Sequence, residues 1–173
     1  MYPASTTKMM TAILVIENCD LQEIVTVSET ALQNIPTGYV TCDLSVGEEI
    51  SVNDLLYALM VPSANDAAYV LAEHVAGSVD AFANMMNNKA REIGCTATHF
   101  VNPNGIHDSR HYTTAYDLYL IAKYCMQNET FRNIVSTKEY TLPATNKHEA
   151  ADRTFTTTND LLNPEKTNYY KTA

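Results

Sequence analysis

The spacing of apolar residues along the chain predicts a mostly helical protein. In several segments apolar residues recur every three or four positions, which places them on one face of a helix. Proline, serine, threonine and glycine lie at the ends of these segments, where they act as start and stop signals. The pattern predicts helices over 7–18, 51–60, 64–76, 79–93, 114–126 and 129–135, the fifth capped by Thr113 or Thr114.

Shorter segments read as strands, so the expected fold class is α+β. Residues 24–27 alternate weakly between apolar and polar, and β-like pieces such as 39–41 lie within 37–49. Two further strands are predicted over 139–142 and 154–158. The chain of 173 residues has no internal repeat and is long enough for one domain or one large subdomain.

Composition excludes several classes of function. The net charge is −9, from 20 acidic and 11 basic residues without a Lys/Arg cluster, so a nucleic-acid partner is not expected. His107 and His111 lie four apart in a glycine-containing loop rather than on a helix, so we expect no metal site. Without C-x-x-C spacing, the cysteines are expected to be free and mostly buried thiols: Cys19, Cys42, Cys95 and Cys125.

The candidate chemistry begins at Ser5 and Lys8. On a helix, side chains three apart lie on one face within reach of each other. A serine needs a neighbouring base to become a nucleophile, and a lysine kept neutral by burial can be that base. At a helix start, backbone N–H groups could also face a developing oxyanion. We therefore expect Ser5 and Lys8 to be catalytic.

A second pair, Ser63 and Asn65, follows in a tight loop between two predicted helices. Ser63 could relay the proton from Lys8 to a leaving amine, and Asn65 could hold the substrate's amide and orient Lys8. Each motif alone could be a chance occurrence, such as a helix cap beside a surface lysine. Their joint context, an apolar helix followed by an inter-helix loop, favours the catalytic interpretation.

The chain resembles the low-molecular-mass penicillin-binding proteins, which are serine-type D-alanyl-D-alanine carboxypeptidases of bacterial cell walls. The nucleophile helix of that family resembles residues 3–11, and its second motif resembles 54–68. Residues 100–106 and 112–117 resemble further family stretches, for which the resemblance implies no catalytic role. The similarity covers nearly the whole chain.

The resemblance implies an extracytoplasmic enzyme that removes the terminal D-Ala from peptidoglycan stem peptides through an acyl-serine. Penicillins would acylate the same serine, and no cofactor or metal is implied. Residues 1–173 would be a single partial catalytic domain, the helical part, with most of the five-stranded sheet missing. Because Ser5 lies almost at the start, we expect truncation at both ends, and no signal peptide or membrane-spanning stretch is recognisable.

The family's third motif, Lys-Thr-Gly, is absent. The pairs Lys166-Thr167 and Lys171-Thr172 are followed by asparagine and alanine, so neither is expected to replace it. The tyrosine-rich segment 168–171 resembles the family's stretch just before that motif. We therefore expect this chain alone to be weakly active or inactive, and its sheet-facing apolar surface to favour self-association.

Two alternatives stay open. A class A-like β-lactamase shares both motifs but needs a glutamate for deacylation, and Glu129 with Asn133 forms the only E-x-x-x-N after the second motif. A non-catalytic module that recognises peptidoglycan or penicillin would keep the motifs without turnover. Covalent labelling of Ser5 by a penicillin separates an enzyme from an inert module.

Overall fold

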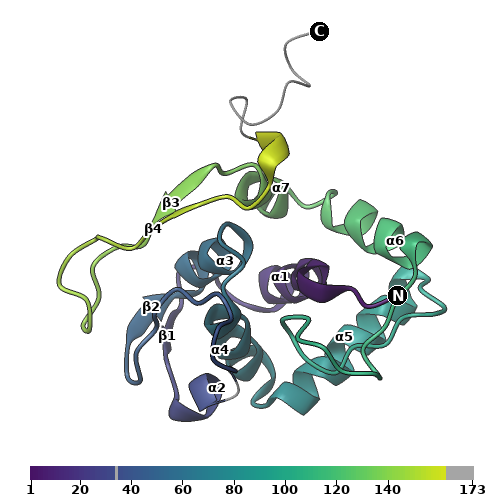
Figure 1. Ribbon diagram of the computed structural model, residues 1–173, viewed down its shortest axis with the longest axis horizontal. Helices are drawn as coiled ribbons and strands as arrows, with labels where there is room; N and C mark the ends of the chain where they lie inside the picture. Colours follow the sequence, from purple (N-terminus) through teal and green to yellow (C-terminus); the bar gives the residue numbers. More distant parts are fainter. Residues whose placement is uncertain (34, 163–173) are drawn as a thin grey trace, which may run out of the picture.

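A buried helix, α1 (Lys8–Asn18), lies at the centre of the fold. The computed structural model describes residues 1–33 and 35–162, and Figure 1 shows α1 surrounded by other helices. A single 3-10 turn, η1 (Ala4–Thr7), leads into α1. Five of the helices in these ranges pack against α1: α3 (Val52–Met60), α4 (Asn65–Ala76), α5 (Val79–Ile93), α6 (Ala115–Cys125) and α7 (Glu129–Val135).

The ends of these helices follow from local side chains. Ser51, Ser78 and Thr114 each accept a hydrogen bond from a backbone N–H in the first turn of the helix that follows. Such caps satisfy donors that the helix itself leaves unpaired. Gly77 and Gly94 adopt left-handed backbone angles after α4 and α5, a conformation that costs glycine little. The predicted helices are confirmed, each within a few residues at its ends.

Between α1 and α3 one helix was missed and one prediction is wrong. A short helix, α2 (Glu29–Gln33), was not predicted, although Ser28 Oγ accepts the N–H of Ala31 at 3.0 Å. The β-like pieces expected within 37–49 form no strand before residue 49. The N–H groups of Cys42 and Leu44 donate to the Asp66 carboxylate, so they are not available to a neighbouring strand.

The strands form two small antiparallel sheets in the described part of the chain. β1 (Ile24–Thr26) pairs with β2 (Glu49–Ser51), which sets Val25 opposite Ile50. β3 (Glu139–Thr141) pairs with β4 (Thr154–Thr156) in a hairpin, and η2 (Asp160–Leu162) follows. The mostly helical α+β class is confirmed.

One hydrophobic cluster fills the space between the helices. Small side chains on α4, among them Ala67 and Ala68, allow close approach to α1 and α3. All four cysteines are free thiols and three of them are buried, as predicted. None of the described helices is long and apolar enough to cross a membrane. The largest fully buried side chains include Met10, Leu55, Leu59, Leu71, Phe82 and Ile121.

A buried ion pair joins the β3–β4 hairpin to the rest of the fold. Arg153 Nη2 lies 2.5 Å from Glu48 Oε1, and neither residue is more than 9% exposed. Arg153 also donates to the carbonyl of Cys42 at 3.2 Å, while Glu48 accepts the Thr145 hydroxyl at 3.0 Å. The charges are therefore compensated within the interior, where an isolated charge would be costly.

We expect Glu48→Gln to destabilise the protein by about 3–5 kcal/mol, because it leaves the buried Arg153 guanidinium without a counter-charge. Urea unfolding followed by circular dichroism measures the change. Glu92→Gln is the matched control, since the Glu92–Lys89 pair involves a carboxylate that is 64% exposed. Equal unfolding midpoints for the two variants would contradict the prediction.

Candidate active site

The candidate nucleophile and base lie together at the start of α1. Ser5 is exposed on η1, whereas Lys8 is only 1% exposed, and Lys8 Nζ lies 3.3 Å from Ser5 Oγ. In a 3-10 turn, side chains three apart are nearly eclipsed, which explains this short approach. Ala4, the residue before Ser5, has φ +49°, a left-handed angle that costs energy for a residue with a Cβ.

Lys8 Nζ has two further oxygen partners. Asn65 Oδ1, on the first residue of α4, lies at 3.1 Å, and the backbone carbonyl of Asn104 lies at 3.2 Å. Asn65 Nδ2 donates to the carbonyl of Val40 at 2.9 Å, so the amide oxygen is the atom that faces Lys8. The amine is therefore held between three elements that are far apart in sequence.

This arrangement suits a neutral amine. A neutral amine has two N–H groups and one lone pair, and the oxygens of Asn65 and Asn104 can accept the two N–H groups. The lone pair then faces the hydroxyl of Ser5. Burial lowers the pKa of Lys8 from 10.5 to about 8, because removal from water penalises the charged form. A base whose pKa lies near neutrality is effective in proton transfer.

Asp66 opposes this effect of burial. Its charge raises the pKa of Lys8, although less than burial lowers it. The carboxylate is 2% exposed and accepts N–H groups from Cys42 at 3.0 Å and Leu44 at 3.2 Å. Asp66 thus fixes the loop next to Asn65 and also limits how far the pKa of Lys8 falls.

Ser63 stands apart from this cluster. Ser5, Lys8 and Asn65 are joined by hydrogen bonds, but the half-buried Ser63 hydroxyl bonds to no other residue in the described ranges. Its backbone is left-handed, with φ +66°, in the turn that separates α3 from α4. The proton relay through Ser63 therefore stays a prediction.

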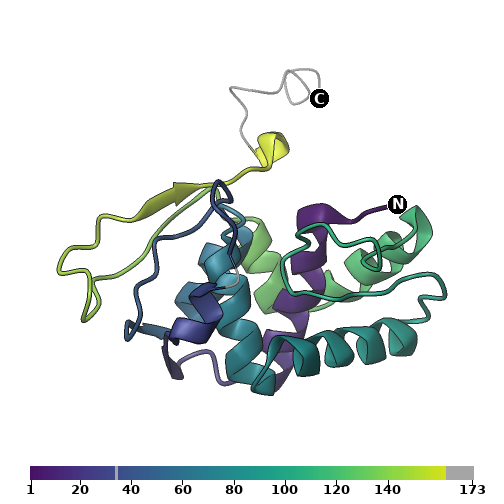
Figure 2. The same cartoon turned by 60° about the horizontal axis from the view of Figure 1, so that its bottom comes forward.

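A loop that sequence reasoning left without a role closes the other side of the site. It connects α5 with α6 and lies beside the start of α1 in Figures 1 and 2. Besides Asn104, its Pro103 carbonyl accepts the Thr11 hydroxyl, and its Gly105 packs on η1. A Cβ on Gly105 would overlap the Ala4 carbonyl oxygen. The resemblance over 100–106 was the available signal, but only the fold reveals the contact.

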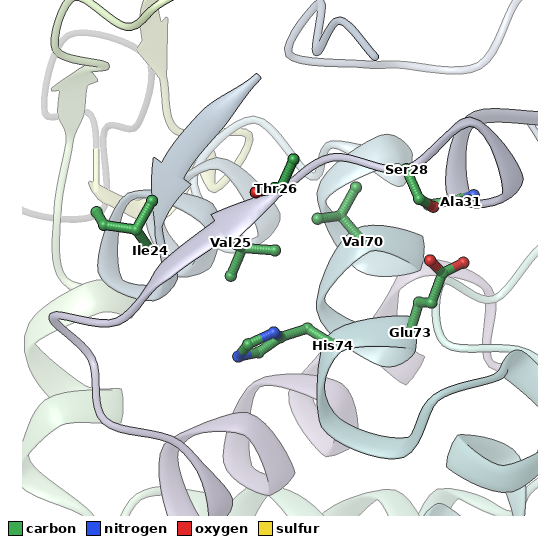
Figure 3. A pocket seen from close by; sticks show the side chains of 8 residues that line it. All are labelled: Ile24, Val25, Thr26, Ser28, Ala31, Val70, Glu73 and His74. Carbon is green, nitrogen blue, oxygen red and sulfur yellow. Dashed lines mark hydrogen bonds between the residues drawn. The ribbon is translucent and has the colours of Figure 1, made fainter. Parts of the chain in front are cut away.

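A separate pocket of about 230 Å³ lies between β1, α2 and α4 (Figure 3). Glu73 and His74 reach it from the C-terminal half of α4, and Val25 lines it from β1. None of the predicted site residues lines it. His74 Nε2 pairs with Glu23 at 3.4 Å, and no group of three metal-binding side chains gathers anywhere in 1–33 or 35–162.

A serine–lysine pair opening a buried helix, with Ser-x-Asn beginning a neighbouring helix, is the arrangement of penicillin-recognising enzymes. A sequence profile for D-alanyl-D-alanine carboxypeptidase (peptidase S11) matches residues 1–173. This chain belongs to that family.

Individual relatives agree with the family match. D-alanyl-D-alanine carboxypeptidase DacF of Bacillus subtilis is 37% identical over 142 residues, covering 79% of this chain and 36% of the relative. A D-alanyl-D-alanine carboxypeptidase of Streptomyces sp. strain K15 is 39% identical, covering 83% and 52%. The Streptomyces K15 DD-transpeptidase crystal structure superposes with a TM-score of 0.85 at 37% identity, covering 93% and 66%. The chain thus spans about half or less of the length of these curated relatives.

We expect Lys8→Met to remove a pH dependence of stability. The pKa of Lys8 is about 8 in the folded chain, against 10.5 for a solvated lysine, so the unfolded chain binds more protons between these values. The free energy of unfolding of the wild type should therefore rise relative to Lys8→Met by up to about 3 kcal/mol as pH rises through this window. Urea titrations at several pH values measure the difference, in which other titrating groups cancel. A constant difference would contradict the lowered pKa.

We expect Gly105→Ala to disturb the turn that carries Ser5, because the added Cβ would meet the Ala4 carbonyl and displace η1. Gly94→Ala is the matched control: it has a similar left-handed angle, but its Cβ would meet nothing within 4 Å. Gly105→Ala should lower the unfolding midpoint more than Gly94→Ala and should move the NMR signals of Ser5. Identical effects of the two variants would exclude a packing role for Gly105.

Proposed function

We propose that this chain is the helical part of a serine-type D-Ala-D-Ala carboxypeptidase domain. The observation that carries the proposal is the buried Lys8 amine, held between the oxygens of Asn65 and Asn104 and next to the hydroxyl of Ser5. The substrate would be a peptidoglycan stem peptide ending in D-Ala-D-Ala. The family membership supports the same substrate class.

In the proposed reaction, Ser5 Oγ attacks the carbonyl carbon of the penultimate D-Ala while Lys8 Nζ takes the hydroxyl proton. The tetrahedral intermediate collapses, its C–N bond breaks, and the terminal D-Ala leaves after its amine receives a proton from Lys8. Ser63 relays that proton if its hydroxyl turns towards Lys8. Water, deprotonated by the neutral Lys8, then hydrolyses the acyl-serine and restores Ser5.

Asn65 would serve both the enzyme and the substrate. Its amide oxygen accepts a hydrogen bond from Lys8, and its Nδ2 group donates to the Val40 carbonyl. A substrate amide that approaches Ser5 could share the remaining hydrogen-bonding capacity of this side chain. We expect Asn65 to contribute to both substrate binding and the orientation of the base.

The proposal includes low turnover by this chain alone, because residues 1–173 contain no Lys-Thr-Gly motif. Both Lys-Thr pairs and the segment 168–171 lie outside the described residues. The family motif implies an anchor for the substrate carboxylate and one oxyanion donor. Loss of a single oxyanion donor typically slows turnover by about 10²–10³-fold.

Place of action and partners are also proposals. A cell-wall substrate would put the enzyme outside the cytoplasm, and penicillins would acylate Ser5. Self-association would occur through the sheet-facing apolar surface, for which we propose the apolar hollow of about 260 Å³ lined by Met9, Met60, Met126 and Phe131 among others. Analytical ultracentrifugation at several concentrations tests that association.

The alternatives gain less support from the geometry. Glu129, the candidate deacylating glutamate of a β-lactamase, is exposed in the first turn of α7 and has no hydrogen bond to Ser5, Lys8, Ser63 or Asn65. A non-catalytic module would not require an amine with a pKa lowered to about 8 beside a serine. Both alternatives are outcomes of the following experiment.

We expect a fluorescent penicillin to label Ser5 covalently, with a rate that rises with pH through about 8 as Lys8 loses its proton. Peptide mapping identifies the labelled residue, and a D-Ala release assay measures turnover on a D-Ala-D-Ala peptide. Ser5→Ala should abolish labelling, while Ser28→Ala, which removes a serine remote from Lys8, should leave it unchanged.

Each alternative outcome has a defined meaning. Absence of labelling between pH 6 and 10, in a chain that is folded by circular dichroism, would favour the non-catalytic module. Rapid release of hydrolysed penicillin would favour the β-lactamase. Labelling of a residue other than Ser5 would overturn the assignment of the nucleophile.

A further inference from the structure

We propose that His111 is a positioning residue: through Thr7 it holds the loop 99–112 against η1, the turn that carries Ser5, and thereby keeps water away from Lys8. The activity readout for this inference depends on the proposed function. The main readout, which is the titration of Lys8, does not depend on the proposed function.

The contact between His111 and Thr7 crosses from the loop to η1. His111 Nε2 lies 2.8 Å from Thr7 Oγ1, and both residues are buried, with 2% and 1% of their surface exposed. The N–H of Val101 points at His111 Nδ1 over 3.2 Å. Because Nδ1 accepts this bond it carries no proton, so Nε2 carries the proton and donates to Thr7.

The surroundings of His111 keep this tautomer in place. Burial lowers the pKa of His111 from 6.5 to about 4, so the ring is neutral near pH 7. The charge of Asp108 raises the pKa of His111, whereas His99 lowers it further. Asp108 is itself paired with Arg110 at 2.8 Å. The ring also meets Phe100 edge to face, with centroids 5.5 Å apart. The imidazole is therefore fixed by a hydrogen bond at each nitrogen and by packing.

Thr7 is the point at which this contact can influence the site. It lies between Ser5 and Lys8 in sequence, and the same loop touches Ala4 through Gly105 and Lys8 through Asn104. The loop therefore contacts η1 at Ala4 and Thr7 and the start of α1 at Lys8. The His111–Thr7 bond joins two side chains, whereas the loop meets Ala4, Lys8 and Thr11 through its own backbone, so this bond can be removed without changing those backbone groups.

Loosening of this loop has a defined chemical consequence. The pKa of Lys8 is low because the amine is buried, so entry of water would raise it from about 8 towards 10.5. Each unit of rise lowers the neutral fraction of Lys8 about tenfold at pH 7. A packing defect behind Thr7 would thus appear as a smaller fraction of neutral Lys8 at pH 7.

The test measures the pKa of Lys8 by NMR in protein labelled with ¹³C-lysine, with the signal assigned from Lys8→Arg. We expect His111→Phe and Thr7→Val, which remove the donor and the acceptor, each to raise this pKa by about one unit or more. His111→Gln keeps an N–H donor at a similar reach and should restore most of the wild-type value. His107→Phe is the matched control, because His107 is exposed in the same loop and contacts Tyr2.

Labelling by a fluorescent penicillin gives the second readout. In His111→Phe and Thr7→Val the labelling rate at pH 7 should fall about tenfold for each unit by which the pKa of Lys8 rises. The rate should recover at higher pH. A merely structural role would lower the rate equally at every pH. If the wild type is not labelled, the proposed function fails, while the NMR titration still decides the role of His111.

An unchanged Lys8 pKa in folded His111→Phe or folded Thr7→Val would overturn the inference. Since Thr7→Val is nearly isosteric, it provides the decisive measurement if His111→Phe does not fold. An equal rise of the pKa in His107→Phe would also overturn it, because the effect would then belong to the loop in general.

Discussion

The candidate active site is organised around one buried amine. Lys8 is 1% exposed, and a charged lysine at such a depth is costly unless it is paired. Within residues 1–33 and 35–162, no carboxylate forms an ion pair with Lys8 Nζ. The protein supplies two neutral oxygens, from Asn65 and Asn104, which match the two N–H groups of an uncharged amine. The arrangement of α1, α4 and the loop 99–112 serves this requirement.

Asp66 shows how two opposing effects set the value of the Lys8 pKa. Burial alone would favour the neutral amine strongly, and the nearby carboxylate moderates this preference. Asp66 is itself retained by a structural need, because it accepts N–H groups from Cys42 and Leu44 in a loop without strand partners. Electrostatic tuning and backbone satisfaction thus depend on the same side chain, and a change at Asp66 would alter both.

Sequence reasoning predicted what is encoded locally. Helix starts such as Ser51 and the pairing of Ser5 with Lys8 depend on residues three positions apart, so pattern alone reveals them. Asn104 and His111 escaped assignment because their contacts with Lys8 and Thr7 cross about a hundred residues of chain. The segment 37–48 was misread for a related reason: its β-like composition could not reveal that Asp66 accepts its N–H groups.

The same logic extends from the site to the distant hairpin. Cys42 donates its N–H to Asp66 and accepts Arg153 at its carbonyl, so this one residue is fixed from both sides. Arg153 in turn depends on Glu48 for its counter-charge. The loop beside Asn65 is therefore held by polar contacts with α4 on one side and with the β3–β4 hairpin on the other. A loop without regular secondary structure can position the Asn65 amide only if such contacts replace the missing backbone ladder, because an unsatisfied buried N–H or carbonyl would favour a different conformation.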